Sequence, residues 1–295
     1  MDRITAMKLF VRVAEAGSFS IAARESATTQ SAVSKQVAAL EAHLGVKLLS
    51  RSTRALSLTA EGEAFFPEAR RLVVDFEAAE ERLRGGRARL TGWLRVAASV
   101  GYGRSILMPR VLSFLKQHSD LRIDLRLSDG FTDLIEEGVD VAVRIGDLPD
   151  SGLVARKIGV SQRMLVAHPS YFAGLSDGGP RLEHPRDLTA HNCIVYTEAV
   201  AQSDWEFVGP DGESARVRVK GNLQTNSSEA IRAAARSGLG VCHAPNWLIA
   251  EELASGQVRI LLPEWRGKPF PIHAVYPAHR KHVAKIDAFI SHLMT

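Results

Sequence analysis

Apolar and polar positions recur at helical spacing in the stretch TTQSAVSKQVAALEAHLG, residues 28–45. One side is apolar and predicts a surface that packs against a core, made by Val33, Val37, Leu40 and Leu44. The other side holds small residues, two hydroxyls and one long cation: Ser31, Ser34, Lys35, Ala38 and Ala42. Surface helices usually fill that side with charged residues. The pattern therefore predicts a helix that another molecule can approach closely.

Two helices are predicted before this one. An apolar stripe predicts a first helix that ends at Gly17, and it consists of Ile4, Met7, Phe10, Val11 and Ala14. Ser18 or Ser20 can cap a second, short helix that runs to about Glu25. Its inward residues are Phe19, Ala22 and Ala23.

A short turn then leads to the third helix, which Thr28 or Thr29 caps and Gly45 ends. Helix, turn and helix, the second with a sparse outer side, is the geometry of a helix-turn-helix. Small side chains let such a helix lie deep in the major groove, where base edges and phosphates come within reach of Gln30, Ser31, Ser34 and Lys35. The alternative is an ordinary three-helix domain whose outer side happens to be small.

Two short strands, Val46–Leu49 and Ala55–Leu58, are predicted next, with the turn RSTR at 51–54 between them. This hairpin predicts a wing whose Arg51 and Arg54 lie along the DNA backbone or minor groove. Residues 1–60 hold eight basic and four acidic side chains, so they carry the whole formal net charge of +4. The distribution of charge, more than its total, favours a phosphate-binding surface here.

A long helix is predicted from Thr59 to about Arg84, before Gly85 and Gly86. Its apolar residues alternate spacings of three and four, as in a coiled-coil seam, and the predicted dimer contacts are Phe65, Ala69, Leu72, Phe76 and Leu83. The alternative is an amphipathic helix covered within its own chain. No neighbouring helix follows to cover the stripe, which favours dimerisation. Pro67 lacks an amide donor and should kink the first two turns.

From Trp93 onward, strand and helix patterns alternate, which predicts an α/β unit with a parallel sheet. The first strands are expected at 93–98, 122–127 and 140–145, with helices at 106–117 and after Ser128. Further strands are expected at 163–167, 192–196, 216–220, 240–244, 258–262 and 271–276, and helices at about 228–237 and 282–293. The late strand suggests two lobes joined by two crossings, with the first lobe built from both ends of the segment.

The composition is that of a globular protein, with 45% hydrophobic and 24% charged residues. No apolar run approaches the roughly 20 residues of a membrane span, and the charged N-terminal stretch is unlike a signal peptide. Cys193 and Cys242 lie far apart, which predicts buried free thiols in a reducing cytosol and gives no metal-binding spacing. We therefore expect a cytoplasmic location.

The chain resembles the LysR-type transcriptional regulators over its whole length. The stretches that carry the resemblance are FVRVAEAGSFSIAA (10–23), TQSAVSKQVAALEAHLGVKLLSRSTRALSLTAEG (29–62), DVAVRIGDLPDSGLVARKIG (140–159), AHPSYF (167–172), HPRDLTAHNCIVY (184–196) and GLGVCHAPNWL (238–248). Ser31, Ser50 and Pro67 depart from the family pattern.

The resemblance implies an N-terminal all-α winged helix-turn-helix (1–58) and a linker and dimerisation helix with a hinge (59–90). A two-lobed α/β effector domain (91–295) that resembles type 2 periplasmic binding proteins would follow. Lobe one would hold about 91–162 and 268–295, and lobe two about 163–267. The implied function is transcription regulation through double-stranded promoter DNA, by a homotetramer made as a dimer of dimers that acts at the nucleoid and can contact RNA polymerase.

The small-molecule effector is expected between the lobes, where strands end and helix N-termini converge, because that arrangement favours an anion. Four loops meet this description, at 99–103, 128–130, 144–147 and 225–228. The predicted effector contacts are Ser99, Val100, Ser128, Arg144, Gly146, Asn226, Ser227 and His243. Arg144 beside hydroxyl-rich caps suggests a small carboxylate, and no cofactor or metal is predicted.

Two other classes of protein, an enzyme and a pure solute receptor, are alternatives to the regulator. An enzyme would need a catalytic motif, and the sequence contains no HExxH and no phosphate-binding glycine loop. A pure solute receptor would share the two-lobed part, but the N-terminal DNA-binding pattern disfavours it. Sequence-specific binding to promoter DNA would separate the regulator from both.

Overall fold

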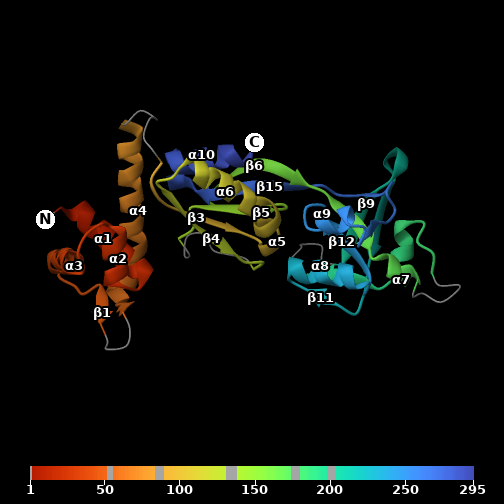
Figure 1. Ribbon diagram of the computed structural model, residues 1–295, viewed down its shortest axis with the longest axis horizontal. Coiled ribbons are helices and arrows are strands. Elements are labelled where there is room, and N and C mark those ends of the chain that lie inside the picture. Colours follow the sequence, from red (N-terminus) through yellow and green to blue (C-terminus); the bar gives the residue numbers. More distant parts are fainter. Residues whose placement is uncertain (1, 52–55, 84–89, 131–137, 174–179, 198–202) are drawn as a thin grey trace. The chain divides into compact units, whose positions relative to one another are not determined.

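The computed structural model describes residues 2–51, 56–83, 90–130, 138–173, 180–197 and 203–295 (Figure 1). The chain forms two compact units. One is Met1–Ala88 with His282–Ala284, and the other is Arg89–Lys281 with Lys285–Thr295. Within the described parts, no helix combines the length and apolar character needed to cross a lipid bilayer.

The first unit begins with three helices, as predicted: α1 (Arg3–Ala16), α2 (Phe19–Glu25) and α3 (Gln30–Leu44). Ser18 caps α2, and Thr29 caps α3 by accepting a hydrogen bond from the amide of Ala32. Gly45 ends α3 with a φ of 74°, the left-handed conformation that glycine adopts without strain. On α3, Val33, Val37 and Leu40 are buried in the shared core, but the predicted core residue Leu44 is 38% exposed because it lies in the last turn.

The wing strands are β1 (Leu49–Arg51) and β2 (Leu56–Leu58), which pair antiparallel with Leu49 opposite Leu58. The first strand starts three residues later than predicted. The amides of Leu48 and Leu49 donate instead to the buried carboxylate of Glu41 on α3, at 3.0 and 3.2 Å. A side chain of the helix therefore holds the segment before the strand. Residues 52–55, with most of the predicted RSTR turn, lie outside the described residues.

Helix α4 (Ala60–Leu83) runs without a break through Pro67. Its predicted dimer seam divides into two parts. Ala69 is fully buried in the core of the three-helix unit, and Phe65 packs against that core with its ring centroid 5.8 Å from that of Phe10. Leu72 and Phe76 are 45% and 40% exposed.

The prediction of a dimer contact is therefore wrong for Ala69, and Phe65 packs mainly against the core of its own chain. The prediction allowed only for a covering helix that follows α4, whereas α1, which precedes α4 in the chain, packs against it and shares a core with Phe65 and Ala69. Leu72 and Phe76 stay predicted dimer contacts. The side chain of Leu83 lies outside the described residues.

The second unit contains two five-stranded sheets. The first has the order β4-β3-β5-β15-β6. Its strands are β3 (Gly92–Ala98), β4 (Leu121–Leu127), β5 (Val141–Ile145), β6 (Leu153–Ser161) and β15 (Phe270–Pro277). A continuous helical segment follows β3, made of α5 (Val100–Tyr102), the π-helical turn η1 (Gly103–Leu107) and α6 (Met108–Gln117). Phe114 of α6 packs against Phe289 of the C-terminal helix α10 (Ala284–Leu293), with ring centroids 5.2 Å apart. We call this sheet and its helices lobe one.

The second sheet has the order β11-β8-β12-β7-β13. Its strands are β7 (Arg163–Ala167), β8 (Cys193–Tyr196), β11 (Gln224–Thr225), β12 (Val241–Pro245) and β13 (Arg259–Ile260). Side chains alternate across it: Val166, Ile194 and Cys242 pack with α8 (Ser228–Ser237), while Leu165, Cys193 and Val241 face the opposite core. A small sheet of order β10-β9-β14 supplies that core and contains β9 (Asp204–Val208), β10 (Ser214–Arg218) and β14 (Arg266–Gly267). The helices α7 (Pro169–Ala173), α9 (Ala250–Ala254), η2 (Pro185–Ala190) and η3 (Pro210–Gly212) complete lobe two.

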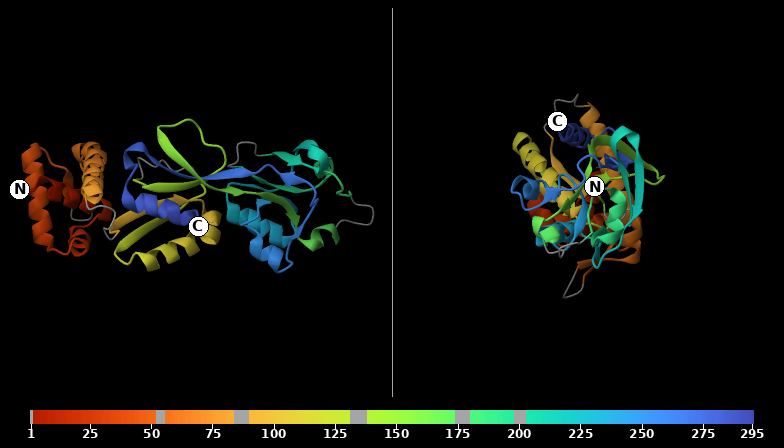
Figure 2. Two further views of the ribbon diagram at one scale, coloured as in Figure 1. Left: turned by 90° about the horizontal axis from the view of Figure 1, so that it is seen from above. Right: turned by 90° about the vertical axis from the view of Figure 1, so that its right-hand side faces the viewer.

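Two chain segments join the lobes, between Ser161 and Arg163 and between Gly267 and Phe270. They continue from β6 and β15, which pair antiparallel and run side by side in the left view of Figure 2. The parallel sheet is confirmed for β3 with β4 and for β3 with β5, but β15 pairs antiparallel with both β5 and β6. The sheet is mixed because the chain returns from lobe two in the opposite direction.

Most predicted elements of this unit are present, and α8 has the predicted bounds of 228–237. The predicted strand at 216–220 begins two residues earlier, as β10. Four strands were missed: β6, β9, β11 and β14. Most residues of β6 are at least partly exposed, so it lacks a clear apolar alternation. The helix expected after Ser128 falls largely on 131–137, outside the described residues.

Candidate DNA-binding face and interlobe site

The outer face of α3 carries the predicted DNA contacts at its N-terminal end. Gln30, Ser31 and Lys35 are exposed, and Ser34 is half-buried. The Gln30 Oε1 accepts a hydrogen bond from the hydroxyl of Ser20 at 3.0 Å, and the hydroxyls of Ser31 and Thr29 lie 3.0 Å apart. Neighbouring side chains on α2 and the helix cap therefore orient two of the four predicted contacts.

Ser20 was predicted only as an alternative cap of the second helix. Ser18 is the cap, and Ser20 is exposed on α2 with its hydroxyl on Gln30. Two exposed hydroxyls on successive helices were visible in the sequence, but their proximity depends on the crossing of α2 and α3.

The wing begins next to the end of α3. Arg51 is the last residue of β1, while its side chain and all of Arg54 lie outside the described residues. The Nζ of Lys47 lies 2.7 Å from the Glu41 carboxylate, and the Lys47 side chain is 75% exposed. Burial, the largest influence, raises the pKa of Glu41, but the Lys47 hydrogen bond and the amides of Leu48 and Leu49 together lower it below its ordinary value. A buried, ionised carboxylate thus connects α3 to the start of the wing.

Three of the four predicted effector loops, 99–103, 128–130 and 225–228, meet in the second unit at the carboxylate of Asp129, which was not among the predicted effector contacts. Asp129 follows β4 in lobe one. Its Oδ1 accepts a hydrogen bond from the amide of Val100 at 2.9 Å, and its Oδ2 accepts one from the amide of Ser228 at 3.0 Å. The Ser228 hydroxyl lies 3.2 and 3.3 Å from the two carboxylate oxygens and accepts from the amide of Gly101 at 3.2 Å.

These contacts join the N-terminal ends of two helices, one from each lobe. Val100 and Gly101 begin the helical segment of lobe one, and Ser228 begins α8 of lobe two. The approach is close, since a Cβ at Gly101 would lie 2.7 Å from the Ser228 Oγ and 2.9 Å from Leu248 Cδ1. Glycine is therefore the residue that this contact accommodates. We call Asp129, Val100, Gly101 and Ser228 the Asp129 cluster.

Further contacts between the lobes surround this cluster. The Nε of Arg104 lies 3.1 Å from Glu229 Oε1, and its Nη1 lies 3.6 Å from Glu251 Oε1. Tyr102 packs edge-on against Trp247, with ring centroids 5.4 Å apart. Lobe one and lobe two are thus joined by hydrogen bonds, ion pairs and an aromatic contact along one side.

The other predicted effector residues have varied surroundings. Ser99 precedes α5 and is half-buried, whereas Ser128 is exposed and its hydroxyl accepts from the Gly130 amide at 3.2 Å. Asn226 is exposed, and the Ser227 hydroxyl caps α8 by accepting from the Ala230 amide. The structure therefore brings Ser228, and not Ser227, onto the carboxylate. Sequence alone did not distinguish the capping serine from its neighbour.

Arg144 and Gly146 lie at the end of β5. Arg144 is half-buried and stands opposite His273 of β15 in the sheet register. Gly146 is buried, with a φ of 109°, and its amide donates to the Pro271 carbonyl at 2.9 Å. Gly146 thus makes a turn that only glycine adopts readily, and its described contact is with the backbone of the return strand.

His243 is a correction to the predicted effector contacts. Its ring packs between Trp205 and Phe207, with centroids 5.2 and 5.0 Å away, and its Nε2 is buried against Gly267. Burial above all, with a smaller effect from Arg163, lowers the pKa of His243 to about 3. This neutral imidazole belongs to the aromatic core of lobe two, which contradicts its prediction as an effector contact.

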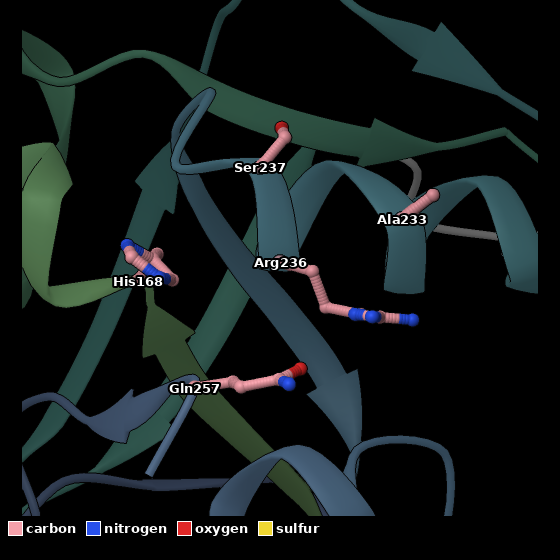
Figure 3. Close-up of a pocket in the computed structure, with 5 residues that line it drawn as sticks. All are labelled: His168, Ala233, Arg236, Ser237 and Gln257. Atoms are coloured by element: carbon pink, nitrogen blue, oxygen red, sulfur yellow. The ribbon is translucent and has the colours of Figure 1, made fainter.

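A surface pocket of about 460 Å³ lies elsewhere in lobe two (Figure 3). Its lining comes from the end of β7, from the C-terminal half of α8 and from the segment after α9: His168, Ala233, Arg236, Ser237 and Gln257. The pocket contains none of the predicted effector contacts. Among the described residues, no group of three or more His, Cys, Asp or Glu side chains is arranged to hold a metal ion.

Two successive parts of the chain match two family domains. Residues 4–63 match the bacterial regulatory helix-turn-helix protein of the lysR family, and residues 87–295 match the LysR substrate binding domain. An HTH-type transcriptional repressor of Pseudomonas aeruginosa is 32% identical over 295 residues, which cover all of this chain and 92% of that protein. The HTH-type transcriptional activator AaeR of Escherichia coli is 31% identical over 293 residues, covering 99% of this chain and 93% of AaeR.

Solved structures agree with these matches. CrgA, a LysR-type transcriptional regulator from Neisseria meningitidis, superimposes with a TM-score of 0.60 at 32% identity, covering 99% of each chain. The full-length Vibrio cholerae virulence activator AphB gives a TM-score of 0.59 at 27% identity, covering 98% of each chain. With both domains matched in order over nearly the whole length, the chain belongs to the LysR family of transcriptional regulators.

Proposed function

We propose that this regulator reads promoter DNA through the outer face of α3 and that a small-molecule effector between the two lobes controls its activity. The observation that carries the DNA-binding part is the exposed N-terminal end of α3, where Gln30 and Lys35 stand among small side chains. A major groove about 12 Å wide admits a helix whose outer side chains are this small.

Different contacts are proposed for the polar residues of this face. The Gln30 amide can pair with an adenine edge, and its hydrogen bond to Ser20 would hold it in one orientation. Lys35 would contact a phosphate, as would Arg51 and Arg54 of the wing. Ser31 and Ser34 can donate to a phosphate or to a base edge.

The second half of α4 offers a surface through which two copies of the chain can associate. Leu72 and Phe76 are exposed apolar side chains on a long helix, and we propose that they form the two-fold contact of a dimer. Two such dimers would make the homotetramer expected for the family. We also propose that the regulator is not an enzyme, that it works in the cytoplasm at the nucleoid where its DNA is, and that RNA polymerase is a further partner.

The effector is proposed to bind where the loops after β3, β4 and β5 approach the start of α8. The polar groups available there include Ser99, Ser128, Arg144 and Asn226. Helix N-termini from both lobes point to a small carboxylate as the ligand class, since such ends favour negative charge. No cofactor is proposed.

Fluorescence anisotropy with DNA from the chain's own promoter region tests the DNA-binding part. Lys35→Ala should weaken binding to all DNA and reduce the slope of log affinity against log salt by about one. Gln30→Ala should cost roughly 1–3 kcal/mol on the preferred site and relax the preference at one base pair.

Lys116→Ala is the matched control for Lys35→Ala, because it removes one exposed lysine from lobe one. It should leave both affinity and salt slope unchanged. The proposal fails if Lys35→Ala and Gln30→Ala bind every tested DNA as the unchanged protein does.

A further inference from the structure

We infer that Asp129 is an internal anionic ligand of the interlobe site: it holds the two lobes together when no effector is present, and an effector carboxylate must displace it. The inference deepens the effector part of the proposed function and rests on it. Its basis is the set of donors from both lobes that converge on the Asp129 carboxylate.

The donors have the arrangement that a bound carboxylate would require. One oxygen faces the Val100 amide at 2.9 Å and the other faces the Ser228 amide at 3.0 Å. The Ser228 hydroxyl is within 3.3 Å of both oxygens and can donate its proton to one of them. Hydrogen bonds to an ionised acceptor are stronger than neutral ones, and the positive ends of two helices add to the attraction.

The contact of Asp129 with Ser228 joins the two lobes. The other links between the lobes are the two chain crossings and the surrounding side-chain contacts. Asp129 and Ser228 are 99 residues apart in the chain, and the Ser228 side chain is buried. The close packing of Gly101 against Ser228 and Leu248 leaves little room for a ligand alongside Asp129. The expected position of the effector carboxylate is therefore already filled by the protein's own carboxylate.

A carboxylate attached to the chain competes for these donors at a much higher effective concentration than a free carboxylate does. Asp129 sits on the loop directly after β4, and such attachment corresponds to an effective concentration of millimolar or more. A free carboxylate therefore competes only when it gains additional contacts or reaches a comparable concentration. Asp129 sets the concentration threshold for carboxylate effectors and disfavours small anions that lack further contacts.

Chemical rescue of the full-length Asp129→Ala variant tests this inference. The substitution removes a group the size of formate and leaves the donors of Val100 and Ser228 in place. Thermal unfolding of the effector domain, followed by calorimetry, should shift down by roughly 5 °C, because charge-assisted hydrogen bonds are lost in a domain of about this size. Sodium formate in the tens-of-millimolar range, about the effective concentration of a short tether, should restore at least half of that shift.

Three comparisons make the result specific. Formamide, the neutral analogue of formate, should not restore the unfolding temperature of Asp129→Ala. The unchanged protein should need at least about tenfold more formate for an equal shift, since Asp129 competes for the same donors. Asp150→Ala, which removes an exposed carboxylate of lobe one, should neither lower the unfolding temperature nor respond to formate beyond a sodium chloride control.

The inference is overturned if formate stabilises the unchanged protein and Asp129→Ala equally, or if it stabilises neither. Should Asp129→Ala fail to fold, Asp129→Asn retains the size and removes the charge. An unfolding temperature of Asp129→Asn equal to that of the unchanged protein would then also overturn it.

These measurements contain no DNA, so they separate the inference from the DNA-binding part of the proposed function. Loss of formate rescue together with normal promoter binding rejects only the role of Asp129. Failure of the unchanged protein to bind promoter DNA counts against the proposed function and leaves the rescue result to be judged by itself.

Discussion

Glu41 offers a sharp test of how the recognition helix is attached to the wing. The residue is only 7% exposed, and its Oε1 accepts from the amides of Leu48 and Leu49. Glu41→Ala removes this acceptor and leaves two buried N–H groups, each of which costs about 1–3 kcal/mol when unpaired. Allowing for partial relaxation of the loop, we expect the free energy of unfolding of the first unit to fall by roughly 2–4 kcal/mol.

The pH dependence supplies a second, independent measurement. The folded-state pKa of Glu41 lies below its ordinary value of 4.5, so the ionised carboxylate stabilises the folded state at pH above 4.5. This stabilisation is lost as the pH falls through the folded-state pKa. The difference in stability between the unchanged protein and Glu41→Ala should therefore shrink below about pH 4.5.

Urea denaturation followed by far-ultraviolet circular dichroism measures both effects. Lys47→Ala is the matched control, because it removes the ion pair of Glu41 while keeping both amide contacts. Lys47 is 75% exposed, so its loss should cost no more than about 1 kcal/mol. The reasoning is refuted if Glu41→Ala lies within about 0.5 kcal/mol of the unchanged protein at pH 7, or if its deficit is the same at pH 3 and pH 7.

Three further predictions concern other buried or exposed groups. Leu72→Glu/Phe76→Glu places like charges on the exposed half of α4 and should dissociate the dimer with little loss of helix content. Light scattering measures the oligomeric state, and an unchanged oligomer rejects the contact. Burial raises the pKa values of Cys193 and Cys242 to about 12, so neither thiol should react with an aromatic disulfide reagent at pH 8 until urea unfolds the chain; rapid labelling of the native protein contradicts this. Because the pKa of His243 is about 3 in the folded protein and 6.5 in the unfolded chain, the free energy of unfolding should fall as the pH drops from 6.5 toward 3. The variant His243→Asn should show a weaker dependence of stability on pH, and equal dependence in both proteins refutes this prediction.

Local chemistry explains why the boundaries of several helices could be predicted. Thr29 caps α3 with its own hydroxyl, and Gly45 ends that helix in a conformation that other residues rarely adopt. The same applies to α8, where Ser227 is the cap and Gly238 ends the helix with a φ of 74°. Each of these interactions spans only a few residues, so the residue types and their spacing carry the information. The family and its order of domains were identified in a different way, through the resemblance of stretches such as residues 10–23 and 29–62 to LysR-type regulators.

Prediction failed where a distant segment decided the environment of a residue. Ala69 has the spacing of a dimer seam, yet α1 covers it, and spacing along α4 does not reveal which face of the helix meets α1. His243 was predicted near the end of a strand, where a ligand-binding residue could lie, but it is the middle residue of β12, and β9 brings Trp205 and Phe207 onto its ring.

The sequence by itself determined the helix-turn-helix, the long helix after it and the alternation of strands and helices, because short-range caps and apolar periodicity govern these features. Only the tertiary structure decided that Asp129 meets Ser228 across 99 residues of chain. Both loops were recognisable as ends of strands or starts of helices. The choice of which side chain fills the shared space depends on how the sheets of the two lobes approach each other, and no local spacing encodes that approach.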